Sequence, residues 1–336
     1  MDSAHFATDK EIERLQKRIR SIYAQAEKQV KTELQRWANS IKETADNLLQ
    51  AIEDAKTDTE RRAAENAYKQ FFIREVKKDK SFVKASQNAA RTLYNANVEA
   101  QRIINSRTTQ VYVDNYNAIG RQAQRSLSGY KFQPVTVSDA EKYGEITEPT
   151  VDRQKDENWN AKNIAASVVS AAMLLCGVDK IVRNSANMTA KKNYDGGKRQ
   201  ASDTLTDAEN KGRLDSMWRV YDEGFENVKK EWVCIFDNRT RETHIEYNDL
   251  GAVELDYEYA PGLQRPKDPH CSDMSEVCNC RCALTTNFGL SKGQTRAARV
   301  GEVTGSYKLP SSFAGTETEQ VPRMTYKEWM EWRKSR

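Results

Sequence analysis

Proline and glycine are scarce in the first third of this 336-residue chain, where the first glycine is Gly120 and the first proline is Pro134. Roughly 119 residues therefore pass without a strong helix breaker, which favours long helices. Apolar residues make up only 38% of the chain and the mean hydropathy is −0.84. These values argue against one large spherical core and favour an elongated helical part joined to a compact part.

Long apolar runs are also lacking. The longest, from Ile164 to Val178, has about 15 residues and contains Ser167 and Ser170, so it is too short and too polar for a transmembrane helix. The first residues, Met1 to His5, have neither the basic start nor the apolar stretch of a signal peptide. We therefore expect no membrane contact, and synthesis in a reducing cytoplasm.

Charge is distributed unevenly, although the formal net charge is only +4. Residues 1–75 carry 14 basic and 14 acidic side chains, whereas residues 76–133 carry 10 and 3, a net charge of +7. Residues 134–290 carry 20 basic and 27 acidic side chains, and residues 291–336 carry 9 and 5. A basic segment beside an acidic body suggests contact with a polyanion or an acidic partner.

The first 53 residues contain an apolar stripe with a mean spacing of about 3.64 residues, which matches the α-helical period. A break near Asp58 and Thr59 is expected, because both side chains compete with the helical backbone. A second helix follows, and a third is predicted from Phe82 towards Ile119. The stripe consists of Ile12, Leu15, Ile19, Ile22, Ala26, Val30, Leu34, Trp37, Ile41, Ala45, Leu48 and Ile52.

The basic segment 76–133 coincides with the third predicted helix and is interleaved with tyrosines at 94, 112, 116 and 130. One interpretation is a surface that follows a phosphate backbone without reading sequence. The other is a solvated helix face whose tyrosines are half-buried against neighbouring helices. The sequence leaves both interpretations open.

Further along the chain, Ile164 to Val182 predicts a buried helix of small residues. A turn at Asp195-Gly196-Gly197 is expected to separate it from an amphipathic helix through Leu205 and Trp218.

Near the carboxyl end, residues 291–325 are rich in Gly, Ser and Thr and predict an extended or flexible linker. Beyond them, Tyr326, Trp329, Met330 and Arg333 have the spacing of a short amphipathic helix. A helix this short needs a groove in which to dock, on this chain or on a partner.

The residues with the most distinctive chemistry lie between Glu231 and Leu284. A predicted strand, Lys230 to Asp237, contains Trp232 and is followed by Asn238-Arg239-Thr240-Arg241-Glu242-Thr243-His244. The segment continues through Gly251 and Pro269-His270 and closes with Asn279-Cys280-Arg281-Cys282.

This segment resembles the phage Mu F-like minor head proteins, also called phage head morphogenesis proteins. The resemblance covers about 55 residues and rests on Trp232, Asp237, Arg239, Thr240, Arg241 and His244, then Gly251, Pro269 and His270, and finally Asn279, Cys280, Arg281 and Cys282. It implies a structural component of the virion, with no catalytic activity, that is associated with the portal and acts in head assembly.

Physical chemistry allows two roles for Asp237 and His244. The Asp237 carboxylate can pair with Arg239 or Arg241 and accept a hydrogen bond from His244, which makes a buried network that fixes a loop-rich domain. The alternative is a catalytic Asp–His pair. In particular, a metal-dependent nuclease could be built from Asp237, His244, Asp249 and His270.

The thiols invite a zinc site, because cytosolic clusters of Cys and His bind metal more often than they form disulfides. A structural zinc held by His244, His270 or Cys271 with Cys280 and Cys282 is one interpretation. Buried free thiols and disulfides are the others. In an extended strand, successive thiols of Cys278, Cys280 and Cys282 would lie about 6.6 Å apart, so a zinc site requires a turn or bulge there.

The fold we expect is α+β and predominantly helical, with long amphipathic amino-terminal helices followed by a small α+β domain. The expected parts are a helical domain at 1–133, a crossing segment at 134–159, the Mu F-like domain at 160–290, and a linker with a short helix at 291–336. The implied location is the head interior or portal vertex of the virion. The implied partners are the portal protein, the major capsid or scaffold protein, and double-stranded DNA. No cofactor is expected beyond the zinc considered above.

Overall fold

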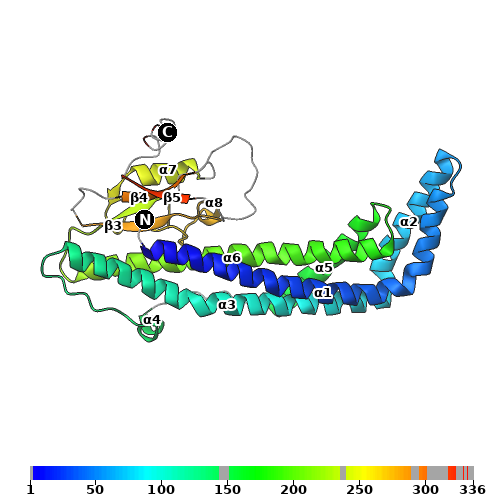
Figure 1. Ribbon diagram of the computed structural model, residues 1–336, viewed down its shortest axis with the longest axis horizontal. Coiled ribbons are helices and arrows are strands. Elements are labelled where there is room, and N and C mark those ends of the chain that lie inside the picture. Colours follow the sequence, from blue (N-terminus) through cyan, green and yellow to red (C-terminus); the bar gives the residue numbers. More distant parts are fainter. Residues whose placement is uncertain are drawn as a thin grey trace. The chain divides into compact units, whose positions relative to one another are not determined.

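The computed structural model describes residues 3–143, 151–234, 240–288, 295–300 and 317–322, together with Glu328 and Glu331 (Figure 1). Helices dominate these ranges, and β2, β1 and β3 form a small antiparallel sheet in that order. The predicted class, α+β and predominantly helical, is confirmed.

The elements follow one another along the chain with most helices in the first two thirds. The helices are α1 (Ser3–Glu53), α2 (Asp58–Lys78), α3 (Lys80–Ser126), α4 (Val137–Tyr143), α5 (Arg153–Ala172), α6 (Val178–Asp222), α7 (Glu242–Asp249) and α8 (Met274–Val277). The strands are β1 (Lys229–Val233), β2 (Ala252–Val253), β3 (Ala283–Asn287), β4 (Thr295–Val300) and β5 (Glu317–Pro322).

The chain divides into two compact units, each built from separate stretches of sequence. The sheet unit comprises Met1–Glu13, Ser106–Thr147 and Ala201–Arg336, and the helical unit comprises Arg14–Asn105 and Glu148–Gln200. The long helices α1, α3 and α6 each contribute residues to both units. The consecutive domains expected from the sequence stay a prediction.

The predicted long helix at the amino end is confirmed as α1. Nine members of its apolar stripe are buried, and Ile22, Leu48 and Ile52 are half-buried. The expected break near Asp58 is also present, because α1 ends at Glu53 and Thr57 caps α2. Thr57 and Glu60 form a reciprocal capping box, which satisfies two backbone N–H groups at the start of α2.

In the helical unit, α1, α3 and α6 run side by side (Figure 1). Aromatic side chains fill the end of the core nearest α2, where the Trp37 ring lies 4.9 Å from Phe82 and 6.3 Å from Phe72, centroid to centroid. The Tyr68 hydroxyl donates to the carbonyl of Cys176 at 2.5 Å, which ties α2 to the turn between α5 and α6.

Two predictions for the middle of the chain are wrong. The small-residue segment 164–182 is interrupted, since α5 ends at Ala172 and α6 begins at Val178. The expected turn at Asp195-Gly196-Gly197 lies inside α6 instead. A Cβ at Gly197 would lie 3.3 Å from side-chain atoms of Ile19 and Tyr23, so this glycine permits close packing of α6 on α1 rather than a turn.

The segments predicted as linkers contain regular structure. The crossing segment 134–159 holds α4 and the first residues of α5. In the predicted flexible linker, β4 and β5 pair antiparallel, with Thr295 opposite Pro322. The short carboxy-terminal helix lies outside the described residues except for Glu328 and Glu331, which are helical.

Within the described ranges, none of the helices combines the length and the apolarity that crossing a bilayer requires.

A second glycine of α6 makes a close contact that we expect to be sensitive to substitution. A Cβ at Gly212 would clash with the backbone carbonyl oxygen of Tyr112 on α3, whereas a Cβ at Gly196 would meet no atom within 4 Å. Gly212→Ala should therefore lower the free energy of unfolding by about 1–3 kcal/mol. Gly196→Ala is the matched control in the same helix and should raise that free energy by up to about 1 kcal/mol. Equal effects in chemical denaturation would contradict this packing.

The amino end of α1 is held in the sheet unit by a buried ionic cluster. The Nδ1 atom of His5 lies 2.7 Å from Oε1 of Glu209 on α6, and Nε of Arg213 lies 3.2 Å from the same oxygen. All three side chains are at least 97% buried. Burial alone lowers the pKa of His5, but the Glu209 carboxylate, helped by Asp9, outweighs burial and the opposing charge of Arg213, so the pKa is raised above 6.5.

This raised pKa predicts a specific dependence of stability on pH. Because the folded chain holds the proton on His5 more tightly than the unfolded chain, the contribution of His5 is fully present below about pH 6.5. It is lost as the pH rises through the pKa of the folded state. The difference in unfolding free energy between wild type and His5→Gln should therefore shrink as the pH is raised above 6.5. A difference independent of pH would contradict a charged His5.

Candidate functional site

The motif residues gather around the central strand of the small sheet. In β1, Trp232 is 1% exposed and faces Leu284 of β3 across the antiparallel ladder. The predicted strand at 230–237 is confirmed for Lys230 to Val233, which belong to β1. The strand ends at Val233. Asp237 and Arg239 lie outside the described residues, so the predicted network around the Asp237 carboxylate stays a prediction.

Arg241 and His244 lie at the start of the short helix α7. Arg241 is the residue that precedes the first turn of α7, and its guanidinium donates to the carbonyl of Cys278. His244 lies in the helix, is 2% exposed, and its ring contacts Trp232 edge to face at 5.1 Å between centroids. The Trp232 ring also lies 5.2 Å from Tyr247 and 4.9 Å from Tyr259, so His244 belongs to an aromatic core.

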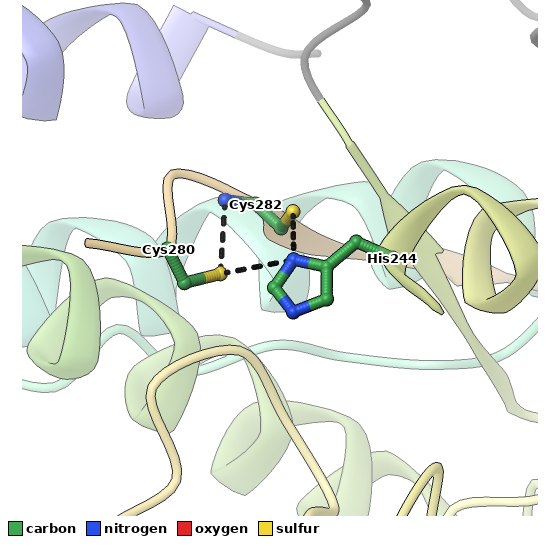
Figure 2. Close-up of side chains that lie close together, drawn as sticks. All are labelled: His244, Cys280 and Cys282. Atoms are coloured by element: carbon green, nitrogen blue, oxygen red, sulfur yellow. Dashed lines mark hydrogen bonds between the residues drawn. The ribbon is translucent and has the colours of Figure 1, made fainter. Parts of the chain in front are cut away.

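Two thiols converge on one nitrogen of the His244 ring. The Sγ atoms of Cys280 and Cys282 lie 3.7 Å and 3.3 Å from Nδ1, and Figure 2 shows both pointing toward it. The potential ligand atoms of the three residues all lie within 4.8 Å of one another, and all three side chains are buried. We call these residues the His–Cys cluster.

The turn that a zinc site would require is present. Residues 278–282 are not an extended strand: α8 ends at Val277, Asn279 has a φ of +56°, and β3 begins only at Ala283. Asn tolerates this left-handed conformation better than most residues. The resulting turn lets the backbone N–H of Cys282 donate to Sγ of Cys280 at 3.4 Å, so both sulfur atoms lie near the same ring.

The other ring nitrogen of His244 is held by Glu276. Its Nε2 lies 3.0 Å from the Glu276 carboxylate and 3.1 Å from the Glu276 carbonyl oxygen. Since both partners can only accept, Nε2 carries the proton and Nδ1 presents its lone pair to the thiols. The Thr243 hydroxyl donates to the same carboxylate at 3.0 Å, which fixes its position.

Burial and mutual contact perturb the two thiols in opposite directions. For Cys280, burial opposes ionisation, but the hydrogen bonds that Cys282 donates through its thiol and its backbone N–H outweigh it and hold the pKa well below its usual range. Burial, reinforced by Cys280 and by the fully buried Cys234, raises the pKa of Cys282 well above its usual range. The pair therefore favours one thiolate, on Cys280, and one thiol.

Two residues of the predicted metal set are not part of the His–Cys cluster. His270 points to solvent with 84% of its side chain exposed, because its ring bonds the carboxylate of Asp268 two residues earlier, at 3.0 Å. The Cys271 thiol is buried but donates to the carbonyl of Asp273 at 3.3 Å. Of the five predicted metal ligands, the structure therefore brings together three: His244, Cys280 and Cys282. The other two, His270 and Cys271, lie elsewhere.

The predicted nuclease constellation is not assembled by the residues that the structure describes. Asp249 and His270 are exposed whereas His244 is buried, and neither joins it in a group of potential metal ligands. Asp237 lies outside the described residues.

The closing motif is fastened to α6 by the side chains of Asn210 and Arg213, which the sequence pattern alone does not reveal. Asn210 donates to the carbonyl of Cys282 at 3.1 Å and accepts from the N–H of Leu284 at 2.7 Å. Arg213 donates to the carbonyl of Leu284 at 3.1 Å and to Oδ1 of Asn115 at 2.9 Å. The signal that could have revealed them is their position: polar residues between the apolar Ala208 and Leu214 of a helix that is buried on most sides here.

Lys230 is a further buried charge beside the motif. Its ammonium donates to the carbonyls of Leu255 and Gln264 at 2.7 Å and 2.8 Å and lies 5.6 Å from the centre of the Tyr259 ring. Burial lowers its pKa to about 8, although nearby carboxylates raise it. These bonds tie the loop that follows β2 to β1.

Fold and site together define a class: a predominantly helical α+β protein with a buried His–Cys cluster packed against Trp232 of its small sheet. Comparison with protein-family models, with curated proteins and with solved structures finds no match for this chain.

Proposed function

We propose that this chain is a minor structural protein of a tailed-phage head that associates with the portal and acts in head assembly. The observation that supports this role is the burial of the motif residues on which the resemblance rests. Trp232, His244, Cys280 and Cys282 are all at most 3% exposed and bond or pack against one another. Side chains that are buried against one another stabilise a docking domain and offer no access to a substrate.

Under this proposal, the carboxy-terminal domain docks on the portal, the major capsid protein or a scaffold protein. The anchoring of β3 to α6 through Asn210 and Arg213 supports such a role, because these buried hydrogen bonds oppose local unfolding of the domain that docks. The protein would be made in the host cytoplasm and reside in the head interior or at the portal vertex of the virion.

The basic segment 76–133 supports a secondary contact with packaged double-stranded DNA. All ten of its basic side chains are exposed, and only Arg102 and Arg107 have ion pairs among the described residues, with Glu99 and Glu11. The tyrosines at 112, 116 and 130 are buried, so they are not available to stack on bases. The contact we propose is therefore with phosphates and independent of sequence.

The alternative function, a metal-dependent nuclease that uses Asp237 and His244, receives no support from the described residues. His244 is 2% exposed and both of its ring nitrogens are engaged, so a scissile phosphate has no access to it. If the proposal is correct, neither wild type nor Asp237→Ala and His244→Ala variants cleave DNA with added divalent metal. Cleavage by wild type that either substitution abolishes would favour the enzyme.

The proposal is tested by co-expression with the portal protein encoded in the same genome. We expect the two proteins to copurify at constant stoichiometry through size-exclusion chromatography. A Trp232→Ala variant, which disturbs the docking domain, should lose the complex, whereas Trp159→Ala, at an exposed position of α5, should keep it. Failure of wild type to associate with the portal, capsid and scaffold proteins would contradict the proposal.

DNA binding is tested separately by the salt dependence of affinity. Replacing Arg121 and Arg125 with Ser should make the slope of log affinity against log salt shallower by about 2, since each phosphate contact contributes about 0.9. Replacing Arg61 and Arg62, which are exposed outside the basic segment, should leave the slope unchanged. Equal slopes for both variants would exclude the basic segment as the DNA contact.

A further inference from the structure

The spacing of the His–Cys cluster is that of a tetrahedral metal site. Zinc bonds sulfur at about 2.3 Å and nitrogen at about 2.0–2.1 Å, so tetrahedral angles separate a ligating nitrogen from a ligating sulfur by about 3.6 Å. The two observed separations from Nδ1 of His244 are 3.7 Å and 3.3 Å. An ion between these three atoms would therefore find both nitrogen-to-sulfur separations close to the tetrahedral value.

The orientation of the imidazole has the same implication. A histidine that binds zinc usually donates its other N–H to a carboxylate or a carbonyl, which fixes the tautomer and makes the free nitrogen a better ligand. In this protein Nε2 has both kinds of acceptor from one residue, Glu276, whose carboxylate is itself held by Thr243. The lone pair of Nδ1 therefore points at the two sulfur atoms (Figure 2).

The environment suits a structural metal rather than a catalytic one. The three residues are at most 3% exposed, and they lie under the Trp232 ring at the junction of α7, β3 and the turn that follows α8. Two thiolates and one imidazole form a donor set that selects zinc among the common divalent ions, and oxygen-preferring ions such as Mg²⁺ and Ca²⁺ are disfavoured.

We propose that His244, Cys280 and Cys282 bind one Zn²⁺ through Nδ1 and the two Sγ atoms, with Glu276 as the residue that positions the imidazole. These atoms supply three of the four positions of a tetrahedral site. Binding releases the remaining thiol protons to solvent and cross-links α7 to the turn before β3. This site does not depend on the proposed virion role, and each can fail without the other.

The direct test is the metal content of the full chain purified under reducing conditions without chelator. Wild type should contain one zinc per chain. Cys280→Ala and Cys282→Ala should lose it, whereas Cys278→Ala, which removes an exposed thiol from the same Cys-x-Cys-x-Cys run, should retain it. Trace zinc in wild type, or equal content in all four proteins, would overturn the proposal.

A second measurement needs no variant and so does not depend on whether a substituted chain folds. In zinc-loaded wild type, a thiol-alkylating reagent should modify Cys278 rapidly and leave Cys280 and Cys282 unmodified. A strong chelator should then increase the reactivity of those two thiols by at least an order of magnitude, because metal removal opens the turn. Reactivity that is the same with and without chelator would contradict zinc ligation.

The positioning role of Glu276 has its own readout. Glu276→Gln should weaken zinc affinity by about 10–100-fold, as removal of the partner of a ligating imidazole does elsewhere. Glu246→Gln, an exposed carboxylate of the same helix as His244, is the control and should not change the affinity. An unchanged affinity in Glu276→Gln would contradict the assignment of Glu276 as the residue that orients the ring.

Discussion

Replacing Arg213 with Met should lower the free energy of unfolding of the sheet unit by about 3–5 kcal/mol. The guanidinium is 1% exposed and joins three elements: it pairs with Glu209 on its own helix, donates to Asn115 of α3, and donates to the carbonyl of Leu284 in β3. Removing it leaves the buried Glu209 carboxylate with less compensating charge. The buried carbonyl of Leu284 also loses a hydrogen-bond donor.

The control for this prediction lies six residues further along the same helix. Arg219 also pairs with a glutamate four residues away, Glu223, but both side chains are at least 30% exposed. Arg219→Met should therefore cost no more than about 1 kcal/mol. Chemical denaturation followed by circular dichroism measures both variants. If both variants lose a similar amount of unfolding free energy, the buried hydrogen bonds and ion pair of Arg213 do not stabilise the unit as proposed.

Trp232→Ala should have an effect of comparable size, with a loss of about 3–5 kcal/mol of unfolding free energy. The indole is 1% exposed, occupies the central strand of the sheet, and packs edge to face against His244, Tyr247 and Tyr259. Its removal leaves a cavity between α7 and the sheet, and the surrounding rings can fill that cavity only in part.

The matched control for Trp232 is Trp218, which belongs to the same unit but is half-exposed on α6, where its ring contacts Tyr221 at 5.6 Å. Because less apolar area is removed from water there, Trp218→Ala should cost less than half as much. The reverse order, with Trp218 the more sensitive position, would mean that the small sheet is not the core of its unit.

The helical part of the fold was predictable because its signals are local. The stripe of α1 repeats at the helical period for twelve positions, and Thr57 with Glu60 carries the signature of a capping box. The failures came where long-range packing overrode local preference. The pair Gly196-Gly197 predicted a turn, yet α6 continues through it. The reason is that Gly197 packs against Ile19 and Tyr23 of α1.

The site was predictable only in outline. His244, Cys280 and Cys282 carry recognisable ligand chemistry, but residue type could not separate them from His270 and Cys271, which point elsewhere. That choice depends on the turn at Asn279 and on the position of α8, both of which are properties of the folded chain. Glu276 could not be identified either, because nothing in a lone glutamate indicates that it will hold a ring 32 residues away in sequence.

The virion assignment is the central claim, and it is tested most directly by quantitative mass spectrometry of phage particles purified from the strain that encodes this chain. We predict that the chain is present in intact, DNA-filled heads together with the portal protein, at a few copies per particle. Particles that contain portal and capsid proteins but none of this chain would contradict the account.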